Sequence, residues 1–255
     1  MMVRSRTGKI AWVTGASSGI GRAVALRLAD EGFIVAVSAR SADKLDALVA
    51  ERPGAIHAYP LDVTDRQALK DAVRGIEQML GPIDLALFCA GNYIRESAGE
   101  FDAGALADLV GLNVVGTGNA LEAVMGPMIA RRSGHIAVVA SVAGYLGLPG
   151  GGIYGATKAA LINLCEALQP QLGSQGVKLQ VINPGFVDTP LTKKNDFPMP
   201  FLISEDEAAH AIVKGLSGSR FEIVFPWRMA VAAKLLAALP YRASLAITRR
   251  MVRKG

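Results

Sequence analysis

Short apolar runs alternate along this chain with longer stretches in which apolar residues recur every three or four positions. The short runs predict strands at residues 10–13, 33–39, 56–61, 83–89, 135–140, 179–182 and 222–226. The longer stretches predict helices between them, with capping boxes expected at Thr64 and at Ser204. Strands and helices that alternate throughout predict an α/β fold: a doubly wound parallel sheet between two helical layers, in a three-layer α/β/α arrangement.

A glycine-rich turn joins the first predicted strand to the first predicted helix. Its sequence is Thr14-Gly15-Ala16-Ser17-Ser18-Gly19-Ile20-Gly21. Glycines let the backbone turn tightly and approach a pyrophosphate, and a helix N-terminus supplies N–H groups and a positive dipole end. Strand, turn and helix in this order predict a Rossmann-type dinucleotide-binding unit.

Small or polar residues follow several of the other predicted strands. In parallel sheets of this kind, ligands bind beyond the carboxyl ends of the strands. The predicted strand ends hold Gly15, Arg40, Asp62, Gly91, Ser141 and Pro184. We therefore expect one site at this edge of the sheet.

The end of the second predicted strand bears on the choice of cofactor. An acid at this position would accept hydrogen bonds from an adenosine ribose and mark NAD, but the chain has Ala39 followed by Arg40. A carboxylate would repel a 2′-phosphate, whereas an arginine can bind it in a fork. Arg40 therefore favours NADP over NAD. The alternative is a solvated arginine ahead of a helix that Ser41 caps.

Tyr154 and Lys158 lie four residues apart in a predicted helix, so they share one face. An isolated tyrosine has a pKa of about 10, and a neighbouring ammonium group lowers that pKa by favouring the tyrosinate. The pair predicts a phenol that donates and accepts protons near neutral pH. The same spacing also occurs in ordinary pairs on helix surfaces.

Composition narrows the class of protein. A chain of 255 residues with a hydrophobic fraction of 51% suits one folded α/β domain, and no apolar run reaches the roughly 20 residues that span a bilayer. Cys89 and Cys165 lie in apolar runs and are expected to be reduced, and no Cys/His spacing predicts a metal site. With no apolar signal segment ahead of Ile10, we expect a cytoplasmic protein.

Positive charge is concentrated at the C-terminus. Residues 221–255 hold seven Lys or Arg and one acid, which gives this segment a net charge of +6. The whole chain has a net charge of +5, so residues 1–220 carry −1. We therefore divide the chain into a dinucleotide-binding domain, residues 1–226, and a basic amphipathic helical extension, residues 227–255. Its Trp, Tyr and basic residues suit attachment to an anionic membrane surface. Packing on the domain or on another subunit is the alternative, and nucleic acid is not an expected partner.

Together these motifs resemble the short-chain dehydrogenase/reductase family over roughly residues 8–220. The resemblance implies that Tyr154 exchanges a proton with the substrate oxygen, which Ser141 hydrogen-bonds. It implies that Lys158 holds the nicotinamide ribose and depresses the pKa of Tyr154, and that Asn113 positions a water linking Lys158 to solvent. The cofactor-binding residues predicted from the motifs and the resemblance are Thr14, Gly15, Ser17, Ser18, Gly19, Ile20, Gly21, Arg40, Asp62, Val63, Ala90, Gly91, Tyr154, Lys158, Pro184, Gly185, Val187 and Thr189.

The chain departs from the family pattern at three positions. Cys89 replaces the asparagine of the usual Asn-Ala-Gly, an asparagine that is chiefly structural in the family. Ser18 is not basic where many NADP-preferring members have Lys or Arg, so the NADP prediction rests on Arg40. Pro170 falls inside the helix that follows Tyr154 and is expected to kink or shorten its final turn.

The resemblance also places a substrate lid at residues 191–203. The lid is rich in apolar side chains such as Phe197 and Phe201, and with Leu146 and Leu148 it suggests an apolar wall for the substrate. The alternative is that these residues only pack the lid down.

The expected function is an NADP(H)-dependent oxidoreductase. It would transfer hydride between nicotinamide and the carbonyl or secondary alcohol of a small apolar substrate, for example one with an acyl chain. Family members are usually homodimers or homotetramers, so a homo-oligomer is expected. The competing hypotheses are a cofactor-binding scaffold or interaction protein, and a peripheral membrane protein with vestigial turnover.

Overall fold

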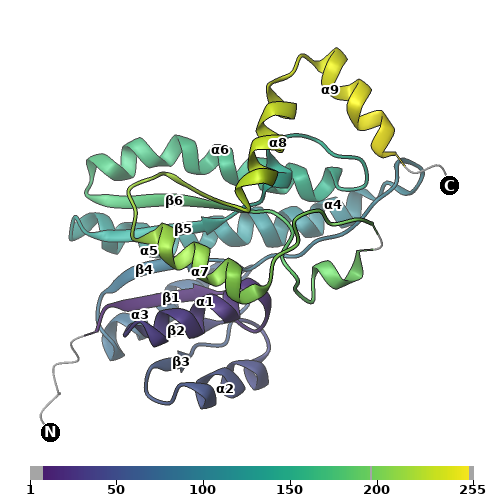
Figure 1. Cartoon of the computed structure of the whole chain (residues 1–255). Coiled ribbons are helices and arrows are strands. Elements are labelled where there is room, and N and C mark those ends of the chain that lie inside the picture. Colours follow the sequence, from purple (N-terminus) through teal and green to yellow (C-terminus); the bar gives the residue numbers. More distant parts are fainter. Residues whose placement is uncertain (1–7, 196, 253–255) are drawn as a thin grey trace, which may run out of the picture.

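A parallel sheet forms the centre of the computed structural model, which describes residues 8–195 and 197–252. Within these residues the sheet has seven strands in the order β3-β2-β1-β4-β5-β6-β7, and each neighbouring pair is parallel (Figure 1). The strands are β1 (Ile10–Thr14), β2 (Ile34–Ser38), β3 (Ile56–Ala58), β4 (Ile83–Phe88), β5 (Gly134–Val139), β6 (Val177–Pro184) and β7 (Glu222–Phe225). The predicted doubly wound parallel sheet is confirmed.

Helices cover both faces of this sheet and extend beyond its edge (Figure 1). One layer contains α1 (Gly19–Asp30), α2 (Ala42–Glu51) and α7 (Glu205–Leu216); the other contains α3 (Arg66–Met79), α5 (Gly116–Ala130) and α6 (Gly152–Ser174), with α4 (Ala103–Val110) against α6. Two last helices, α8 (Trp227–Ala238) and α9 (Tyr241–Thr248), project from the body. Single turns complete the list: η1 (Ala98–Glu100), η2 (Gly111–Val115), η3 (Val142–Gly144), η4 (Thr192–Lys194) and η5 (Arg249–Met251).

The sheet separates two hydrophobic cores, and strand β1 shows how its alternating side chains supply both. Ala11 and Val13 pack with α1, α2 and α7, whereas Ile10 and Trp12 pack with α3, α5 and α6. Because both faces of a parallel sheet are covered, its strands are apolar at nearly every position. This is why the strands appear in the sequence as continuous apolar runs rather than as alternating ones.

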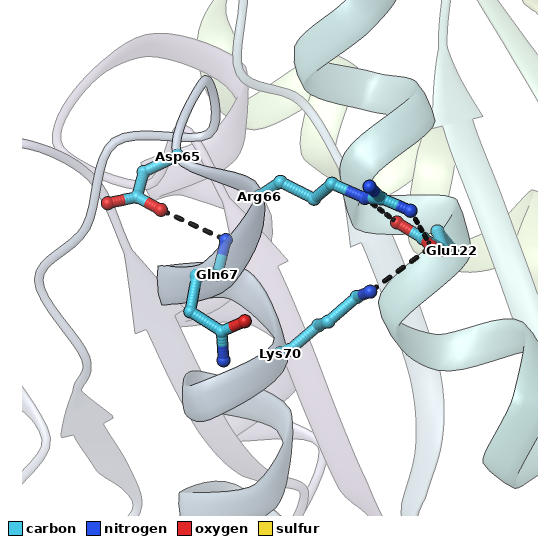
Figure 2. Close-up of polar contacts among 5 residues, drawn as sticks. All are labelled: Asp65, Arg66, Gln67, Lys70 and Glu122. Carbon is cyan, nitrogen blue, oxygen red and sulfur yellow. Dashed lines mark hydrogen bonds and ion pairs between the residues drawn. The ribbon is translucent and has the colours of Figure 1, made fainter.

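Asp65, and not Thr64, caps helix α3, so the capping box predicted at Thr64 is wrong. The Asp65 carboxylate accepts hydrogen bonds from the backbone N–H groups of Gln67 and Ala68, at 2.9 Å each. The Thr64 hydroxyl instead donates to the Asp62 carboxylate at 2.9 Å. A carboxylate is favoured at the positive end of a helix, which gives Asp65 the advantage over a threonine. Figure 2 shows the Asp65 contact with Gln67.

Beyond the cap, two basic residues of α3 reach the carboxylate of Glu122 on α5 (Figure 2). Arg66 Nε lies 2.6 Å and Lys70 Nζ 3.1 Å from Glu122 oxygens. Hydrogen bonds from Arg66 and Lys70 lower the pKa of Glu122 to about 2. All three side chains are well exposed, so these pairs orient the two helices more than they stabilise the fold.

Two of the other helix predictions have mixed outcomes. The capping box of Ser204 and Glu207 is confirmed: Ser204 Oγ accepts from the Glu207 N–H at 3.2 Å, and Glu207 Oε2 accepts from the Ser204 N–H at 2.8 Å. Helix α6 begins two residues before Tyr154 and continues past Pro170 to Ser174, so the predicted shortening is wrong. Burial of Leu172 in the core holds the last turn in place despite the lost hydrogen bond.

Candidate active site

A cleft of about 440 Å³ opens at the carboxyl ends of the strands. The strand order reverses direction between β1 and β4, and in such sheets the crevice at this switch point is where ligands bind. The predicted residues that line the cleft are Gly15, Ser17, Ser18, Gly19, Ile20, Gly21, Arg40, Asp62, Val63, Ala90, Gly91, Ser141, Tyr154, Lys158, Pro184, Gly185, Val187 and Thr189. The structure therefore brings together residues from all along the chain, and it leaves Thr14 and Asn113 outside the cleft wall.

The glycine-rich turn forms one end of the cleft, and two of its glycines are required by close backbone contacts. Gly15 has a φ of 70°, and a Cβ there would lie 2.6 Å from the backbone nitrogen of Ala90. A Cβ on Gly21 would lie 2.4 Å from the carbonyl oxygen of Gly15. Only glycine allows β1, the turn and the end of β4 to pack this closely.

Helix α1 begins at this turn with its N-terminus on the cleft. Its capping residue, Ser18, makes no side-chain hydrogen bond to the helix, and the first turn contains no acid. The first N–H groups of a helix have no partner within it, and they form an anion site with the positive dipole end. A Cβ on Gly19 would meet only Thr189, at 3.5 Å, so no side chain here keeps a ligand away from the helix N-terminus. This chemistry fits the diphosphate of a dinucleotide.

Thr14, predicted to contact the cofactor, instead supports the wall from behind. Its side chain is buried, and its hydroxyl oxygen accepts hydrogen bonds from the N–H groups of Cys89 at 3.3 Å and Ala90 at 3.4 Å. Thr14 thereby joins the end of β1 to the end of β4. The Thr14 hydroxyl is thus used within the sheet edge, and the predicted part of Thr14 in cofactor binding stays a prediction.

Ser141, Tyr154 and Lys158 meet at the other end of the cleft. Ser141 directly follows the end of β5 and Ala140, and its hydroxyl accepts from the Ala143 N–H at 3.1 Å and lies 3.4 Å from the Pro184 carbonyl oxygen, to which it donates. Tyr154 and Lys158 occupy the first two turns of α6, with Lys158 Nζ 5.6 Å from the centroid of the Tyr154 ring. The serine hydroxyl, the phenol and the ammonium group therefore line one small space.

Burial controls the titration of this group. Burial raises the pKa of Tyr154 to about 12, against a hydrogen bond with Ser141 that lowers it. Burial also lowers the pKa of Lys158 to about 8. The predicted depression of the Tyr154 pKa by Lys158 is therefore wrong for this structure. The Lys158 ammonium donates to the Val139 carbonyl at 2.9 Å, and desolvation is the largest contribution to the raised pKa of the Tyr154 phenol.

Asn113 lies behind the wall in the π-helical turn η2 and connects the loop after β4 to α6. Its Nδ2 donates to the Asn92 carbonyl and to Thr157 Oγ1, both at 3.0 Å, and its Oδ1 accepts from the Asn92 N–H at 2.9 Å. Single π turns within helices are frequent at functional sites. The role of Asn113 in positioning a water stays a prediction.

Three residues near the site were missed by sequence reasoning. The ring of Tyr93 meets that of Tyr154 edge to face, with centroids 5.2 Å apart. Glu96 accepts hydrogen bonds from the backbone N–H groups at the start of α6, including that of Ile153 at 3.2 Å. Cys89 lines the cleft, and burial raises the pKa of its thiol to about 11. Tyr93 and Glu96 reach α6 only through the fold, so no local signal indicates them, whereas the motif position of Cys89 beside Ala90 and Gly91 could have indicated it.

The predicted apolar wall is only partly present in this cleft. Leu146 and Leu148 are half-buried and do not line it, whereas Leu191 and Thr192 of the lid do. Phe197 packs edge-on against Phe186, with ring centroids 5.9 Å apart. This packing follows the alternative that lid side chains hold the lid down. Within the described residues, no group of three or more His, Cys, Asp or Glu side chains is placed to hold a metal ion.

Comparison with known proteins decides the family. Residues 9–198 match the model of the short chain dehydrogenase family. The chain belongs to this family. This short-chain dehydrogenase is 36% identical to an uncharacterised oxidoreductase of Myxococcus xanthus over 246 residues, which are 95% of this chain and 97% of the relative. The match confirms the family resemblance, and the protein is an oxidoreductase.

Two further relatives support the same conclusion. A 3-oxoacyl-(acyl-carrier-protein) reductase of Thermotoga maritima is 35% identical over 195 residues, 73% of this chain and 77% of the relative. A solved short-chain dehydrogenase structure from Streptomyces avermitilis has a TM-score of 0.84 and 29% identity, and the match covers 97% of this chain and 98% of that one. The fold is therefore shared along nearly the whole chain.

Proposed function

We propose that this short-chain dehydrogenase uses NADP(H) to interconvert a carbonyl group and a secondary alcohol on a small apolar substrate. One observation carries the proposal: Ser141, Tyr154 and Lys158 converge at one end of a cleft that has an anion-binding helix start at its other end. The first end suits proton transfer to an oxygen, and the second suits a dinucleotide.

The residues of the cleft fit a nicotinamide dinucleotide. The N–H groups at the start of α1 would hold its diphosphate, and Lys158 would hold the nicotinamide ribose. Arg40 and Ser41 line the far wall, where they would hold a 2′-phosphate, and the Ser41 side chain makes no capping bond to α2 that would compete. The bound nicotinamide would supply or accept the hydride.

The proton is the contribution of the protein. With its pKa raised to about 12, the Tyr154 phenol is protonated at neutral pH, which is the form that carbonyl reduction requires of a general acid. The Ser141 hydroxyl would donate a hydrogen bond to the same substrate oxygen and so orient it toward the phenol. In the reverse direction, Tyr154 would have to lose its own proton first, and its tyrosinate form would then accept the proton of the alcohol.

The wall of the cleft and one relative support the proposed substrate class. Leu112, Val139 and Leu191 present apolar surface in the cleft. The Thermotoga maritima relative is named for the reduction of a 3-oxoacyl chain. We therefore propose a ketone on an acyl-chain-like substrate.

The test is NADPH oxidation with ketones of increasing chain length, in the wild-type protein and in Tyr154→Phe. We expect turnover to rise with chain length and to fall by roughly 10²–10⁴ in Tyr154→Phe, the typical contribution of a general acid. Tyr59→Phe, which removes a hydroxyl outside the cleft lining, is the matched control and should keep wild-type activity. NADPH binding without turnover that depends on Tyr154, in either direction of reaction, would instead favour the scaffold hypothesis.

A further inference from the structure

The last two helices display their large apolar side chains outward. On α8, Trp227, Val231 and Leu235 recur every four residues on one face, and Trp227 and Leu235 are 68% and 66% exposed. On α9, Tyr241 and Leu245 continue the pattern, with Tyr241 83% exposed. A helix that packs on a core turns such residues inward, so this arrangement is the reverse of the usual one. Exposed apolar side chains gathered on neighbouring helices are of the kind that marks an interaction site.

Small residues occupy the side of these helices that is turned inward. Ala230 is buried on α8, and Ser244 and Thr248 are the buried residues of α9. The Ser244 and Thr248 hydroxyls donate to the carbonyls of Tyr241 and Leu245, at 3.4 and 3.3 Å. The buried polar groups are thus satisfied within the helix itself. The inward side of α9 can therefore stay buried without unpaired polar groups, while its apolar side chains face outward.

Contacts to the domain hold α8 in this orientation. Lys234 forms an ion pair with Glu222 of β7, and its ammonium lies 5.3 Å from the centroid of the Tyr145 ring. On the same helix, the sulfur of Met229 lies 2.6 Å from the position that a Cβ on Gly185 would take, so Met229 packs directly on that backbone. The base of the extension is therefore fixed while its outer face stays exposed.

The charges beside the apolar face have one sign. Arg228, Arg242, Arg249 and Arg250 are exposed, and residues 227–255 contain no Asp or Glu. The basic residues Arg253 and Lys254 lie outside the described residues. A two-fold contact that placed this surface directly against its own copy would bring arginines toward arginines, and residues 227–255 supply no acid to neutralise them. Charge complementarity therefore disfavours contact of this surface with itself and favours an anionic partner.

We propose that α8 and α9 form a docking surface that seats the protein on an anionic lipid bilayer. Tryptophan, tyrosine and leucine side chains would enter the interface between headgroups and acyl chains, and the arginines would meet the lipid phosphates and carboxylates. None of the described helices is long and apolar enough to cross a bilayer, so the proposed mode is attachment to one surface. The proposal is independent of the proposed reaction.

Sedimentation of the full-length protein with lipid vesicles tests this. Vesicles of phosphatidylcholine with phosphatidylserine should bind the protein, vesicles of phosphatidylcholine alone should bind it less, and high salt should weaken the binding. Because Trp12 is fully buried, a shift of tryptophan emission to shorter wavelength on binding would report entry of Trp227 into lipid. Equal binding to both kinds of vesicle at every salt concentration would contradict the proposed contact between the arginines and anionic headgroups.

Paired variants separate the apolar and charged contributions. Trp227→Ser with Leu235→Ser should weaken vesicle binding by at least about tenfold, since two large apolar side chains leave the lipid. Met79→Ser with Phe101→Ser removes two exposed apolar side chains elsewhere and should leave binding unchanged. Arg242→Glu with Arg249→Glu should abolish the preference for phosphatidylserine. Lys44→Glu with Lys214→Glu changes the net charge equally and should not.

Circular dichroism of each variant would show that it is folded. Light scattering in the absence of lipid measures the molar mass of the protein and tests whether a second copy of the chain covers this face instead. If Trp227→Ser with Leu235→Ser reduces the molar mass of the protein while vesicle binding is absent or unchanged, the surface is an interface between copies of the chain and the proposal is overturned.

Discussion

At the scale of single residues, Arg40 determines which nicotinamide cofactor we expect. It lines the cleft at the end of β2. Hydrogen bonds from Thr64 lower the pKa of the neighbouring Asp62, and the positive charge of Arg40 makes a smaller contribution in the same direction. The Asp62 carboxylate thus accepts hydrogen bonds from the backbone N–H and the hydroxyl of Thr64. Arg40 remains at the wall, where a 2′-phosphate would meet a guanidinium rather than a carboxylate.

Replacing Arg40 by Ala should therefore raise the KM for NADPH by about 10- to 100-fold, because a charge-assisted hydrogen bond contributes about 1.5–3 kcal/mol. The KM for NADH should change little. Initial rates with both cofactors measure this. Lys44→Ala, which removes another exposed positive charge close by in the sequence, is the matched control. Equal increases for both cofactors in Arg40→Ala would reject Arg40 as the phosphate-binding residue.

Lys158 should make cofactor binding depend on pH. Burial lowers the pKa of its ammonium from 10.5 to about 8, so the positive charge that attracts an anionic cofactor is present below this pH and lost above it. Affinity for NADPH, measured by fluorescence titration, should fall as pH rises through about 8. Lys158→Met should bind more weakly at neutral pH and show a flatter profile. A wild-type profile without an inflection in this region would contradict the assignment.

At the scale of elements, Glu222 joins β7, β6, η3 and α8. It accepts hydrogen bonds from Tyr145 and Lys234, and from Asn183 Nδ2 at 2.7 Å. Burial alone would raise the pKa of Glu222, but the hydrogen bonds from Lys234, Tyr145 and Asn183 bring it below 4.5. The sequence indicates Glu222 only as the last acid of the chain. Its role as a junction depends on residues up to 77 positions away.

Glu222→Gln should lower the free energy of unfolding by about 1 kcal/mol at neutral pH, because charge-assisted bonds become neutral and Lys234 is half-exposed. Urea denaturation measures this, and Asp46→Asn on the surface of α2 is the control. The folded pKa is below the unfolded value, so the contribution is present above about 4.5 and lost as pH falls through the folded pKa. The difference between wild type and variant should shrink as pH is lowered over this range. A difference that stays constant would show that the charge of Glu222 is not responsible.

At the scale of the whole molecule, the cleft draws on both halves of the sheet. Its walls come from α1 and the segments after β1, β2 and β3 on one side of the switch point, and from β5, β6, α6 and the segment after β4 on the other. A ligand that binds only this assembled form stabilises it by mass action, by about 2.7 kcal/mol at a hundred times the Kd. Cofactor binding should therefore be visible as thermal stabilisation of the entire domain.

NADPH at this excess should raise the melting temperature by about 5–10 °C in a chain of this size. Gly15→Ala should be less stable and should lose this shift, because its Cβ would lie 2.6 Å from the Ala90 nitrogen at the edge of the cleft. Gly32→Ala carries the same positive-φ strain but meets nothing within 4 Å. It should be modestly destabilised and keep the NADPH shift. Thermal denaturation of the three proteins compares them directly, and a full shift in Gly15→Ala would contradict the proposed cofactor site.

The sequence by itself determined the fold class, the strand positions and most of the cleft wall. Strands buried on both faces must be apolar throughout, and a tight turn against a neighbouring strand requires glycine, so both leave local signals. In a parallel sheet all the carboxyl ends lie on one edge, and residues there can be grouped without knowing distances. This reasoning placed Gly15, Arg40 and Ser141 in one cleft although they are far apart in the chain.

Only the tertiary structure decided how the grouped residues behave. It placed Thr14 and Asn113 behind the cleft wall, because their hydrogen-bond partners come from distant segments. It reversed the expected shift of the Tyr154 pKa, because desolvation depends on what surrounds a group and not on spacing along a helix. It also turned the apolar face of α8 outward, where the sequence allowed either direction. The hydrogen-bond partners, the pKa of Tyr154 and the exposed face of α8 all depend on burial and long-range contacts, which arise only when the chain is folded.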